Sequence, residues 1–315
     1  MKLLIAFLRL VRSLNLFFIV LTQVLFYYCV LPFSFRSVEY TPRLFLQPSL
    51  FWMLCASSLL IAAAGYIIND YFDLNIDQVN KPEKQVVDSI IKRRWAIIWH
   101  WGMSFLGVIL SFYVSWKLNN WVIGIANAGC VFLLMLYSST FKRRVLIGNF
   151  IISVLTAWVI LVLFIAEWDL NRMTTGSVQI AMGRLFKLTV VYAGFAFIIS
   201  LVREVIKDIE DMEGDARYNC KTIPIVWGVT VAKVFSAVWL AVLLAAVVIL
   251  QFYVLQFGWW WSILYSIIFI IAPLILIIFR LYRATTKTDF HWLSNAVKVV
   301  MLTGILSMLF FKLYH

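Results

Sequence analysis

Long apolar segments separated by short polar stretches run along the whole chain. Nine of them hold about 20 predominantly apolar residues, the length that an α-helix needs to cross the hydrocarbon core of a bilayer. These segments lie near 14–33, 49–69, 95–115, 121–139, 147–166, 185–205, 228–250, 259–279 and 293–312. The pattern predicts an all-α, polytopic membrane protein with nine transmembrane helices. Because the segments are evenly spaced and no linker interrupts them, we expect a single domain over residues 1–315.

The N-terminal stretch MKLLIAFLRLVRSLN is amphipathic. Arg9 and Arg12 interrupt its apolar residues, and no small-residue cleavage site follows, so a secretory signal peptide is disfavoured. The apolar positions, among them Leu3, Phe7 and Leu10, fall largely on a different side of a helix from the basic ones. We expect a helix that lies at the membrane interface and leads into the first span.

The composition supports a membrane protein and accounts for its charge. Hydrophobic residues make up 63% of the chain and charged residues only 13%, whereas soluble domains have roughly 45–50% and about 25%. A net charge of +12 would suggest nucleic acid as the partner of a soluble protein. Here about 20 of the 27 Lys and Arg residues belong to one side of the predicted membrane, so the positive-inside rule places that side in the cytoplasm. We therefore expect an integral protein of the cytoplasmic membrane, with its N-terminus in the cytoplasm, its C-terminus outside, and membrane lipids rather than nucleic acid as partners.

Two loops on the more basic side begin with carboxylates at the end of a span. In the first loop, NDYFDLNIDQVNKP, a helix would place the polar residues within a sector of roughly 100°. This first acidic motif consists of Asn69, Asp70, Asp73 and Asp77. In the second loop, REVIKDIEDMEGDAR, carboxylates recur four, three and four residues apart and share one helix face, provided that the helix continues past Gly214. This second acidic motif consists of Glu204, Asp208, Asp211 and Asp215.

Stacked carboxylates repel one another, and each raises the pKa of its neighbours. They are stable as anions only with cations between them, yet the residues next to Asp73 and Asp77 in sequence are not basic. Mg²⁺ suits this arrangement, because it takes oxygen ligands and typically binds one or two carboxylates together with substrate phosphates. A single pair of carboxylates at a membrane rim would more often be solvated and without a role. Two motifs on the same side favour a magnesium-bound diphosphate, with Lys81, Lys84 and Lys142 neutralising its remaining charge.

The two motifs resemble those of a known family. NDYFDLNIDQVNKPEK is similar to the NDxxDxxxD motif of the UbiA-type intramembrane prenyltransferases, and KDIEDMEGDARYNCKTIPIVWG resembles the second acidic run of that family. RSLN at 12–15 and LYSSTFKRRVLIGN at 136–149 resemble the start of its first helix and the segment between its fourth and fifth helices. The resemblance implies nine helices around a central cavity, with both motifs in a polar cap on the cytoplasmic side. It also implies Mg²⁺-dependent transfer of a prenyl group from a polyprenyl diphosphate donor to an acceptor.

The resemblance also implies roles for individual positions. The implied catalytic and metal-binding carboxylates are Asp70, Asp73, Asp77, Asp208, Asp211 and Asp215, with Asn69 as a further metal ligand. The implied substrate-binding residues are Asn15, Asn69, Lys81, Lys84, Tyr137, Lys142, Lys207 and Arg217. Among them, Lys142 matches a basic contact to the diphosphate. For Asn15 and Tyr137, ordinary packing between helices is an equally good interpretation.

The acceptor is expected to be either a lipid or an aromatic ring. Within the family, NDYFD, ID and NKP are most similar to the branch that acts on geranylgeranylglyceryl phosphate, and EDMEGD and KTIP fit the same branch. That branch usually continues with a Pro-Ile-Pro-Ser-Gly-like run, where this chain has QVVDSI. The alternative acceptors are therefore 4-hydroxybenzoate or dihydroxynaphthoate, as in quinone biosynthesis. Haem farnesylation is disfavoured, because its Arg-rich continuation of the first motif is missing.

Two other classes of protein could carry polar clusters in an apolar bundle. A cation-coupled transporter would place its carboxylates near the midplane of the membrane, often in broken helices. Here they occur at the ends of spans on one side, which disfavours transport. A non-catalytic lipid-binding protein would tolerate the loss of motif positions, yet every acidic position of both motifs is present.

Overall fold

The computed structural model describes residues 2–36, 46–80, 86–168 and 176–314, and helices dominate these ranges. An isolated bridge between Val87 and Ile91 is the one extended pairing within them. The α-helices are α1 (Lys2–Leu10), α2 (Ser13–Leu25), α3 (Leu31–Ser34), α4 (Pro48–Phe72), α5 (Leu74–Asn80), α6 (Arg93–Leu118), α7 (Trp121–Ser139), α8 (Ile147–Glu167), α9 (Gly176–Glu210), α10 (Met212–Arg217), α11 (Ile223–Val226), α12 (Val229–Leu255), α13 (Trp260–Ser266), α14 (Ala272–Arg283), α15 (Lys287–Leu306) and α16 (Leu309–Leu313). The π-helical turns Phe26–Val30 and Ile267–Ile271 join α2 to α3 and α13 to α14, and a 3₁₀ turn, Phe141–Arg143, follows α7.

Nine helical segments in the described ranges are long and apolar enough to cross a membrane, which confirms the predicted all-α class. They extend over Ser13–Ser34, Pro48–Phe72, Arg93–Leu118, Trp121–Ser139, Ile147–Glu167, Gly176–Glu210, Val229–Leu255, Trp260–Arg283 and Lys287–Leu313. The largest difference from the predicted spans is the early start of α9 at Gly176, because Arg184 and Lys187 lie within this helix. Arg and Lys are good helix formers with long stems that can reach the interface, so they end an apolar run without ending a helix.

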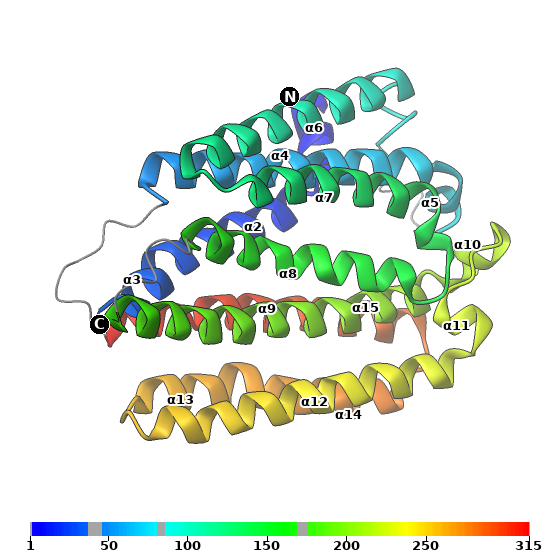
Figure 1. Cartoon of the computed structure of the whole chain (residues 1–315). Helices are drawn as coiled ribbons and strands as arrows, with labels where there is room; N and C mark the ends of the chain where they lie inside the picture. Colours follow the sequence, from blue (N-terminus) through cyan, green and yellow to red (C-terminus); the bar gives the residue numbers. More distant parts are fainter. Residues whose placement is uncertain (1, 37–45, 81–85, 169–175, 315) are drawn as a thin grey trace.

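The spans lie side by side, and their connections gather at the two ends of the bundle (Figure 1). The short helices α5, α10 and α11 lie together at one end, which we call the acidic end because both acidic motifs reach it. The C-terminus, α3 and α13 lie at the opposite end, which we call the far end. The two loops that carry the predicted chemistry are therefore brought to the same end of the molecule, as the span count requires.

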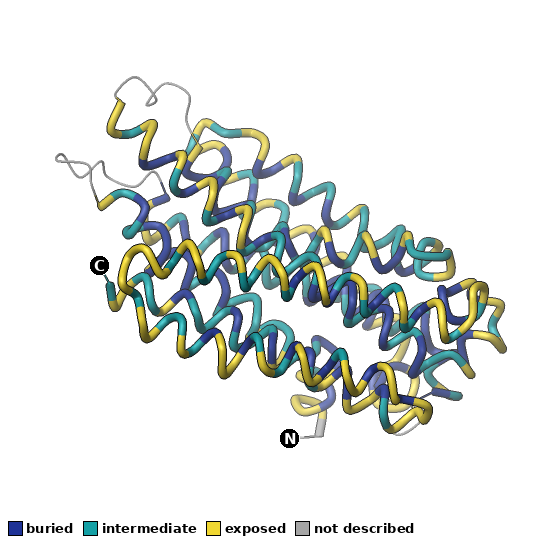
Figure 2. Tube along the Cα trace, turned by 90° about the horizontal axis from the view of Figure 1, so that it is seen from below, coloured by how far each residue is buried: buried dark blue, intermediate teal, exposed yellow. Residues whose placement is uncertain are grey.

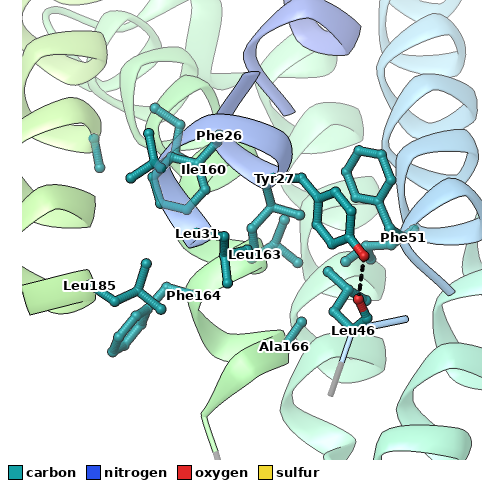
Figure 3. Packing of buried hydrophobic residues seen from close by; sticks show 14 of the residues in the cluster. Phe26, Tyr27, Leu31, Leu46, Phe51, Ile160, Leu163, Phe164, Ala166 and Leu185 are labelled. Atoms are coloured by element: carbon teal, nitrogen blue, oxygen red, sulfur yellow. Dashed lines mark hydrogen bonds between the residues drawn. The ribbon is translucent and has the colours of Figure 1, made fainter. Parts of the chain in front are cut away.

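Apolar side chains pack tightly near the far end (Figure 3). Tyr27 stacks on Phe51 with 4.1 Å between ring centroids, and its hydroxyl donates a hydrogen bond of 2.7 Å to the carbonyl oxygen of Leu46. Leu163 from α8 and Leu185 from α9 are fully buried in the same cluster. Because lipid tails are as apolar as these side chains, van der Waals contact stabilises this packing more than the exclusion of water does. The packing fixes the positions of helices whose other ends carry the acidic motifs.

The outer surface of the bundle is rich in large apolar side chains, and the exposed positions follow its outward faces (Figure 2). Phe105, Ile249 and Phe252 have exposed fractions of 69%, 68% and 69%. Soluble monomers rarely expose contiguous apolar patches beyond a few hundred Å². A bilayer solvates such a surface, and the protein is therefore an integral membrane protein.

The N-terminal stretch forms α1, as predicted, and α1 packs on the loop after the first motif. Phe7 meets Trp99 of α6 edge-on, with 5.1 Å between ring centroids. Leu10 is fully buried in a cluster that includes Val87 and Ile91, whereas Leu4 on the same helix is 62% exposed. These two loop residues lie in or next to the QVVDSI segment that departs from the pattern of the lipid branch. That segment therefore has a packing role, and the position of α1 at the membrane interface stays a prediction.

Candidate functional site

The first acidic motif does not lie on one straight helix, so that part of the prediction was wrong. Helix α4 ends at Phe72, Asp73 has φ −88° and ψ 0°, and α5 starts at the next residue. The backbone still makes turn-like hydrogen bonds, from the Asp73 N–H to the Asn69 carbonyl (3.0 Å) and from the Asp77 N–H to the Asp73 carbonyl (2.8 Å). The chain thus changes direction at Asp73 but keeps the carboxylates of the motif one turn apart.

The second acidic motif breaks in the same way. Helix α9 ends at Glu210, Asp211 has φ −97° and ψ 5°, and α10 follows. The Asp211 N–H bonds the Lys207 carbonyl (2.8 Å), and the Asp215 N–H bonds the Asp211 carbonyl (3.2 Å). The break therefore precedes Gly214, the position past which the prediction required the helix to continue. Gly214 instead lies within α10, where its lack of a side chain allows a contact with the first motif.

That contact is a pair of hydrogen bonds to Asn80, which we call the Asn80 clasp. The Asn80 Nδ2 donates to the carbonyl oxygen of Asp211 (3.0 Å), and the Gly214 N–H donates to the Asn80 Oδ1 (2.9 Å). Asn80 is buried, and the Lys287 ammonium donates to its carbonyl oxygen (3.3 Å). The clasp joins α5 to α10, which lie beside each other at the acidic end (Figure 1), so the two motifs are held facing each other. Asn80 was missed by the sequence reasoning, because nothing in its local pattern separates it from an ordinary loop asparagine.

Lys142 lies between the two motifs. Its ammonium group pairs with the buried carboxylate of Asp73 and is within electrostatic range of Asp215. Burial would lower the pKa of Lys142, but Asp73, Tyr137 and Asp215 raise it well above its ordinary value. No basic residue is adjacent to Asp73 in the sequence, but Lys142 is adjacent to it in the folded chain. Lys142 reaches Asp73 from the 3₁₀ turn that follows α7.

The site holds more negative charge than Lys142 can neutralise. Burial raises the pKa of Asp77 to about 6, and repulsion from Asp73 adds to the effect. Burial also raises the pKa of Asp215 to about 6, with a further contribution from Asp211. A carboxyl group with a raised pKa is one whose charged form lacks sufficient favourable partners. An additional cation at this position would relieve both groups.

The residues present fit Mg²⁺ by their chemistry. They offer carboxylate oxygens, excess negative charge and the buried Oδ1 of Asn69, which accepts no hydrogen bond from any residue in the described ranges. The Asn69 Nδ2 meanwhile donates to Asp73 (2.7 Å), which orients that oxygen. Within the same ranges no three His, Cys, Asp or Glu side chains are grouped closely enough to hold a metal ion by themselves. An open set of ligands suits Mg²⁺, which keeps several waters and shares its coordination with substrate phosphates.

Two further side chains orient carboxylates of the motifs, and the sequence reasoning assigned a role to neither. The Asn149 Nδ2 donates to Asp208 (2.8 Å), and the Arg12 guanidinium pairs with Asp70 at 2.8 Å. Both residues occur inside the segments that resemble the family, RSLN and LYSSTFKRRVLIGN. This resemblance is the feature of the sequence that could have identified them as site residues. The carboxylates of both motifs are thus positioned by groups that are distant in sequence.

The remaining predicted contacts are placed as follows. Tyr137 lies within electrostatic range of Lys142 and of both motifs, and Asn15 lies close to Tyr66, whose ring Arg12 overlies. Lys207 donates to Glu204 (3.2 Å), and Arg203 also pairs with this carboxylate, so two cations of α9 hold Glu204 of the second motif. Arg217 pairs with Glu213 at 2.6 Å on the exposed side of α10, away from the clasp. Lys81 and Lys84 lie outside the described residues.

The chain is similar in sequence to proteins of one family. The model of the UbiA prenyltransferase family matches residues 30–302. A digeranylgeranylglyceryl phosphate synthase of Methanosphaera stadtmanae is 31% identical over 251 residues, which cover 79% of this chain and 82% of that protein.

Solved structures of similar fold match nearly the whole chain. A structure concerned with digeranylgeranylglyceryl phosphate synthase in membranes has a TM-score of 0.60 and 24% identity, and the match covers 98% of this chain and 99% of that one. A UbiA homolog from Archaeoglobus fulgidus bound to DMAPP and Mg²⁺ has a TM-score of 0.53 and 14% identity, with 96% and 98% coverage. At these identities the likeness establishes a shared fold.

Proposed function

This chain belongs to the UbiA prenyltransferase family, and we propose that it transfers a geranylgeranyl group from geranylgeranyl diphosphate to geranylgeranylglyceryl phosphate within the membrane. The proposed diphosphate donor is supported by the two facing acidic motifs. Lys142 neutralises only part of their negative charge, so the motifs can bind further cations together with a diphosphate. The acceptor half is supported by the relative from Methanosphaera stadtmanae, whose name gives a digeranylgeranylglyceryl phosphate product. The protein is a membrane-embedded prenyltransferase. We propose the identity of its two substrates.

We propose that Mg²⁺ binds between the motifs. Its ligands would be drawn from Asn69, Asp70, Asp73, Asp77, Asp208, Asp211 and Asp215. When bound, the ion supplies positive charge that stabilises the diphosphate as a leaving group. The homolog bound to DMAPP and Mg²⁺ supports this assignment through its shared fold. Arg12, Asn149 and the Asn80 clasp hold the ligand-bearing elements in place before substrate arrives.

The reaction breaks the bond between the allylic carbon and the diphosphate oxygen, and it forms a bond from that carbon to the acceptor hydroxyl oxygen. The bonding electrons leave with the diphosphate, and the hydroxyl gives up its proton. Lys142 contacts the diphosphate and balances part of its charge. The surrounding apolar helices accommodate the prenyl chain and keep water from capturing the electron-deficient carbon. Tyr137, close to both motifs and to Lys142, would border the reacting carbon.

We also propose that the acidic end faces the cytoplasm. Basic residues are concentrated there, as in the segments that contain Arg93, Lys142, Lys221 and Arg283. The positive-inside rule assigns such an end to the cytoplasm. The diphosphate donor would then reach the site from the cytoplasmic side, with its chain in the membrane.

Replacement of Lys142 by Met is expected to raise the KM for the prenyl diphosphate donor about tenfold or more, because a charge-assisted hydrogen bond to the diphosphate is lost. Steady-state kinetics with varied donor and saturating acceptor would measure this. Lys187→Met, which removes an exposed lysine from the far half of α9, is the matched control and should leave the donor KM unchanged. An unchanged donor KM in the Lys142 variant would show that Lys142 does not contact the diphosphate.

Mg²⁺ is expected to stabilise the protein more at about pH 7.5 than at about pH 5. Asp77 and Asp215 have pKa values of about 6 in the folded chain, against an ordinary value of 3.8. Because the folded state binds these protons more tightly, the metal-free protein gains stability from them as the pH falls from about 6 to about 4. Mg²⁺ competes with the same protons, so its stabilising effect shrinks over that range.

Thermal unfolding of the purified protein in detergent, with and without Mg²⁺ at both pH values, would test this. In the double variant Asp77→Asn and Asp215→Asn, the difference between the two pH values should disappear. Equal stabilisation of the natural chain at both pH values would show that Mg²⁺ binds away from these carboxylates.

An assay of diphosphate release tests the enzymatic class directly. Release should require both Mg²⁺ and an allylic diphosphate, and it should increase when geranylgeranylglyceryl phosphate is present. A cation-coupled transporter would release no diphosphate under any of these conditions.

A further inference from the structure

A polar cluster lies deeper in the bundle than the carboxylates proposed as Mg²⁺ ligands, and it includes Glu204, the innermost member of the second acidic motif. Its centre is Glu204 of α9, which accepts hydrogen bonds from Arg203 (2.8 Å) and Lys207 (3.2 Å). Lys298 of α15 lies within electrostatic range of Arg203, Lys207, Arg12 and Glu204. These side chains come from α9 and α15, which pack together, and from Arg12 in the turn before α2. We call them the cationic cluster.

The cationic cluster extends into the membrane-spanning part of the chain. Lys298 follows the start of α15 at Lys287 by eleven residues, which places its backbone about 16 Å along the helix from the acidic end. Arg203 precedes the end of α9 at Glu210 by seven residues, or about 10 Å. Asp70, by contrast, is only two residues from the end of α4. Ionisable groups at such depth are costly and mark functional sites or pathways.

Two cations of the cluster have donor atoms without acceptors. Arg203 and Lys207 both donate to Glu204, but Lys298 makes no ion pair or hydrogen bond with any residue in the described ranges. The Nε of Arg203 is buried and likewise has no hydrogen-bond partner there. Arg12 adds no counter-charge, because it pairs with Asp70 and lies over the ring of Tyr66, 5.2 Å from its centroid.

The donors without partners favour an anion that enters the bundle. Lys298 and the Nε of Arg203 have no acceptor among the described residues. A phosphate monoester carries about −1.5 to −2 at pH 7 and offers three strong acceptor oxygens. Arg and Lys donors arranged around one point are the side chains that recognise phosphate.

We propose that the cationic cluster is the binding site for the phosphate monoester of the lipid acceptor, with Lys298 and Arg203 as the principal donors. The proposal rests on the proposed function, because it names the acceptor of that reaction by its charged group. The donor diphosphate occupies the acidic motifs through Mg²⁺, and the acceptor phosphate occupies a separate site deeper in the bundle. The acceptor hydroxyl, which is close to its phosphate in a glyceryl phosphate, is thereby held near the donor carbon. An acceptor without a phosphate would leave these partly buried cations without an anion, which is how such a site rejects it.

The test compares kinetics of the natural chain with those of Lys298→Met and Lys298→Arg. Met is similar in length and apolar, so it removes a partly buried charge without opening a cavity, and the variant should fold. The KM for geranylgeranylglyceryl phosphate should rise at least about tenfold in Lys298→Met, because a charged hydrogen bond is lost. The KM for geranylgeranyl diphosphate should change less than about twofold, since Lys298 does not contact the donor. Lys298→Arg should retain most of the affinity for the acceptor.

A second acceptor, geranylgeranylglycerol, separates the role of the phosphate from that of the lipid chain. The natural chain should use it far less efficiently than the phosphate, and Lys298→Met should reduce that preference at least about tenfold. Lys187→Met is the charge-matched control and should preserve the preference.

Each other outcome overturns the proposal in a distinguishable way. A rise in the donor KM equal to that in the acceptor KM would assign the cluster to the donor diphosphate. Unchanged values for both substrates would mean that Lys298 has no ligand in the reaction. If the natural chain prenylates 4-hydroxybenzoate and not the glyceryl phosphate, the proposed function itself fails, and the phosphate assignment fails with it.

Discussion

Asp73→Asn is expected to reduce kcat for prenyl transfer at least about 100-fold, since loss of one group aimed at the developing charge commonly costs 10²–10³. Asp73 is 3% exposed, lies at the break between α4 and α5, and contacts both Lys142 and Asn69. The amide that replaces it is neutral and binds Mg²⁺ far less well than a carboxylate. The measurement is single-turnover transfer with saturating donor, acceptor and Mg²⁺, which separates loss of chemistry from loss of binding.

A control is needed to separate a catalytic effect of Asp73→Asn from a loss of folding stability. Removing Asp73 leaves the partly buried Lys142 without its ion-pair partner, and breaking a buried ion pair from one side costs up to about 3–5 kcal/mol. The double variant Asp73→Asn and Lys142→Met removes both charges, so its thermal stability should approach that of the natural chain while transfer stays abolished. Activity restored together with stability would show that Asp73 has only a structural role.

Gly214→Ala is expected to uncouple the two motifs. A Cβ at this position would lie 2.4 Å from the Oδ1 and 2.5 Å from the Cγ of Asn80, so the Asn80 amide must move and the clasp hydrogen bonds are lost. Overpacking of this kind costs about 1–3 kcal/mol. Because the motifs then no longer face each other at a fixed separation, the Mg²⁺ concentration for half-maximal activity should rise about tenfold or more, as for loss of groups that orient metal ligands.

Two comparisons separate the clasp from a general loss of stability. Gly183→Ala adds the same methyl group to α9, where nothing lies within 4 Å of the new Cβ, and should change neither the stability nor the Mg²⁺ requirement. The double variant Asn80→Ala and Gly214→Ala relieves the steric clash without restoring the hydrogen bonds. It should regain stability and keep the raised Mg²⁺ requirement. A normal Mg²⁺ requirement in that double variant would contradict a positioning role for Asn80.

The sequence predicted the spans well because the length of an apolar segment is set by the bilayer, not by tertiary contacts. Residues 121–139, predicted as a span, coincide with α7, and both acidic motifs were predicted to reach the same side of the membrane. The breaks at Asp73 and Asp211 were not predicted, because the residues after each break still show helical spacing and form the short helices α5 and α10. Periodicity reports the local backbone and is insensitive to a change of direction between two helices.

The partners of the site residues depend on contacts that are distant in sequence. Lys142 is 69 residues from Asp73, and Gly214 is 134 residues from Asn80. No spacing rule relates such positions, and only the packing of the helices brings them together. Lys298 falls within the predicted span 293–312, and the structure places it three turns inside α15. Its place in the membrane-spanning part of the chain is what gives it a proposed role.

The central claim is most directly tested by supplying the purified protein in detergent with Mg²⁺, radiolabelled geranylgeranyl diphosphate, and geranylgeranylglyceryl phosphate and 4-hydroxybenzoate as competing acceptors. The account predicts label in an ether lipid that retains its phosphate, in a reaction that stops when Mg²⁺ is removed. Label on the aromatic ring, with none in the lipid, would contradict the proposed acceptor, and transfer that persists without a divalent cation would contradict the proposed site.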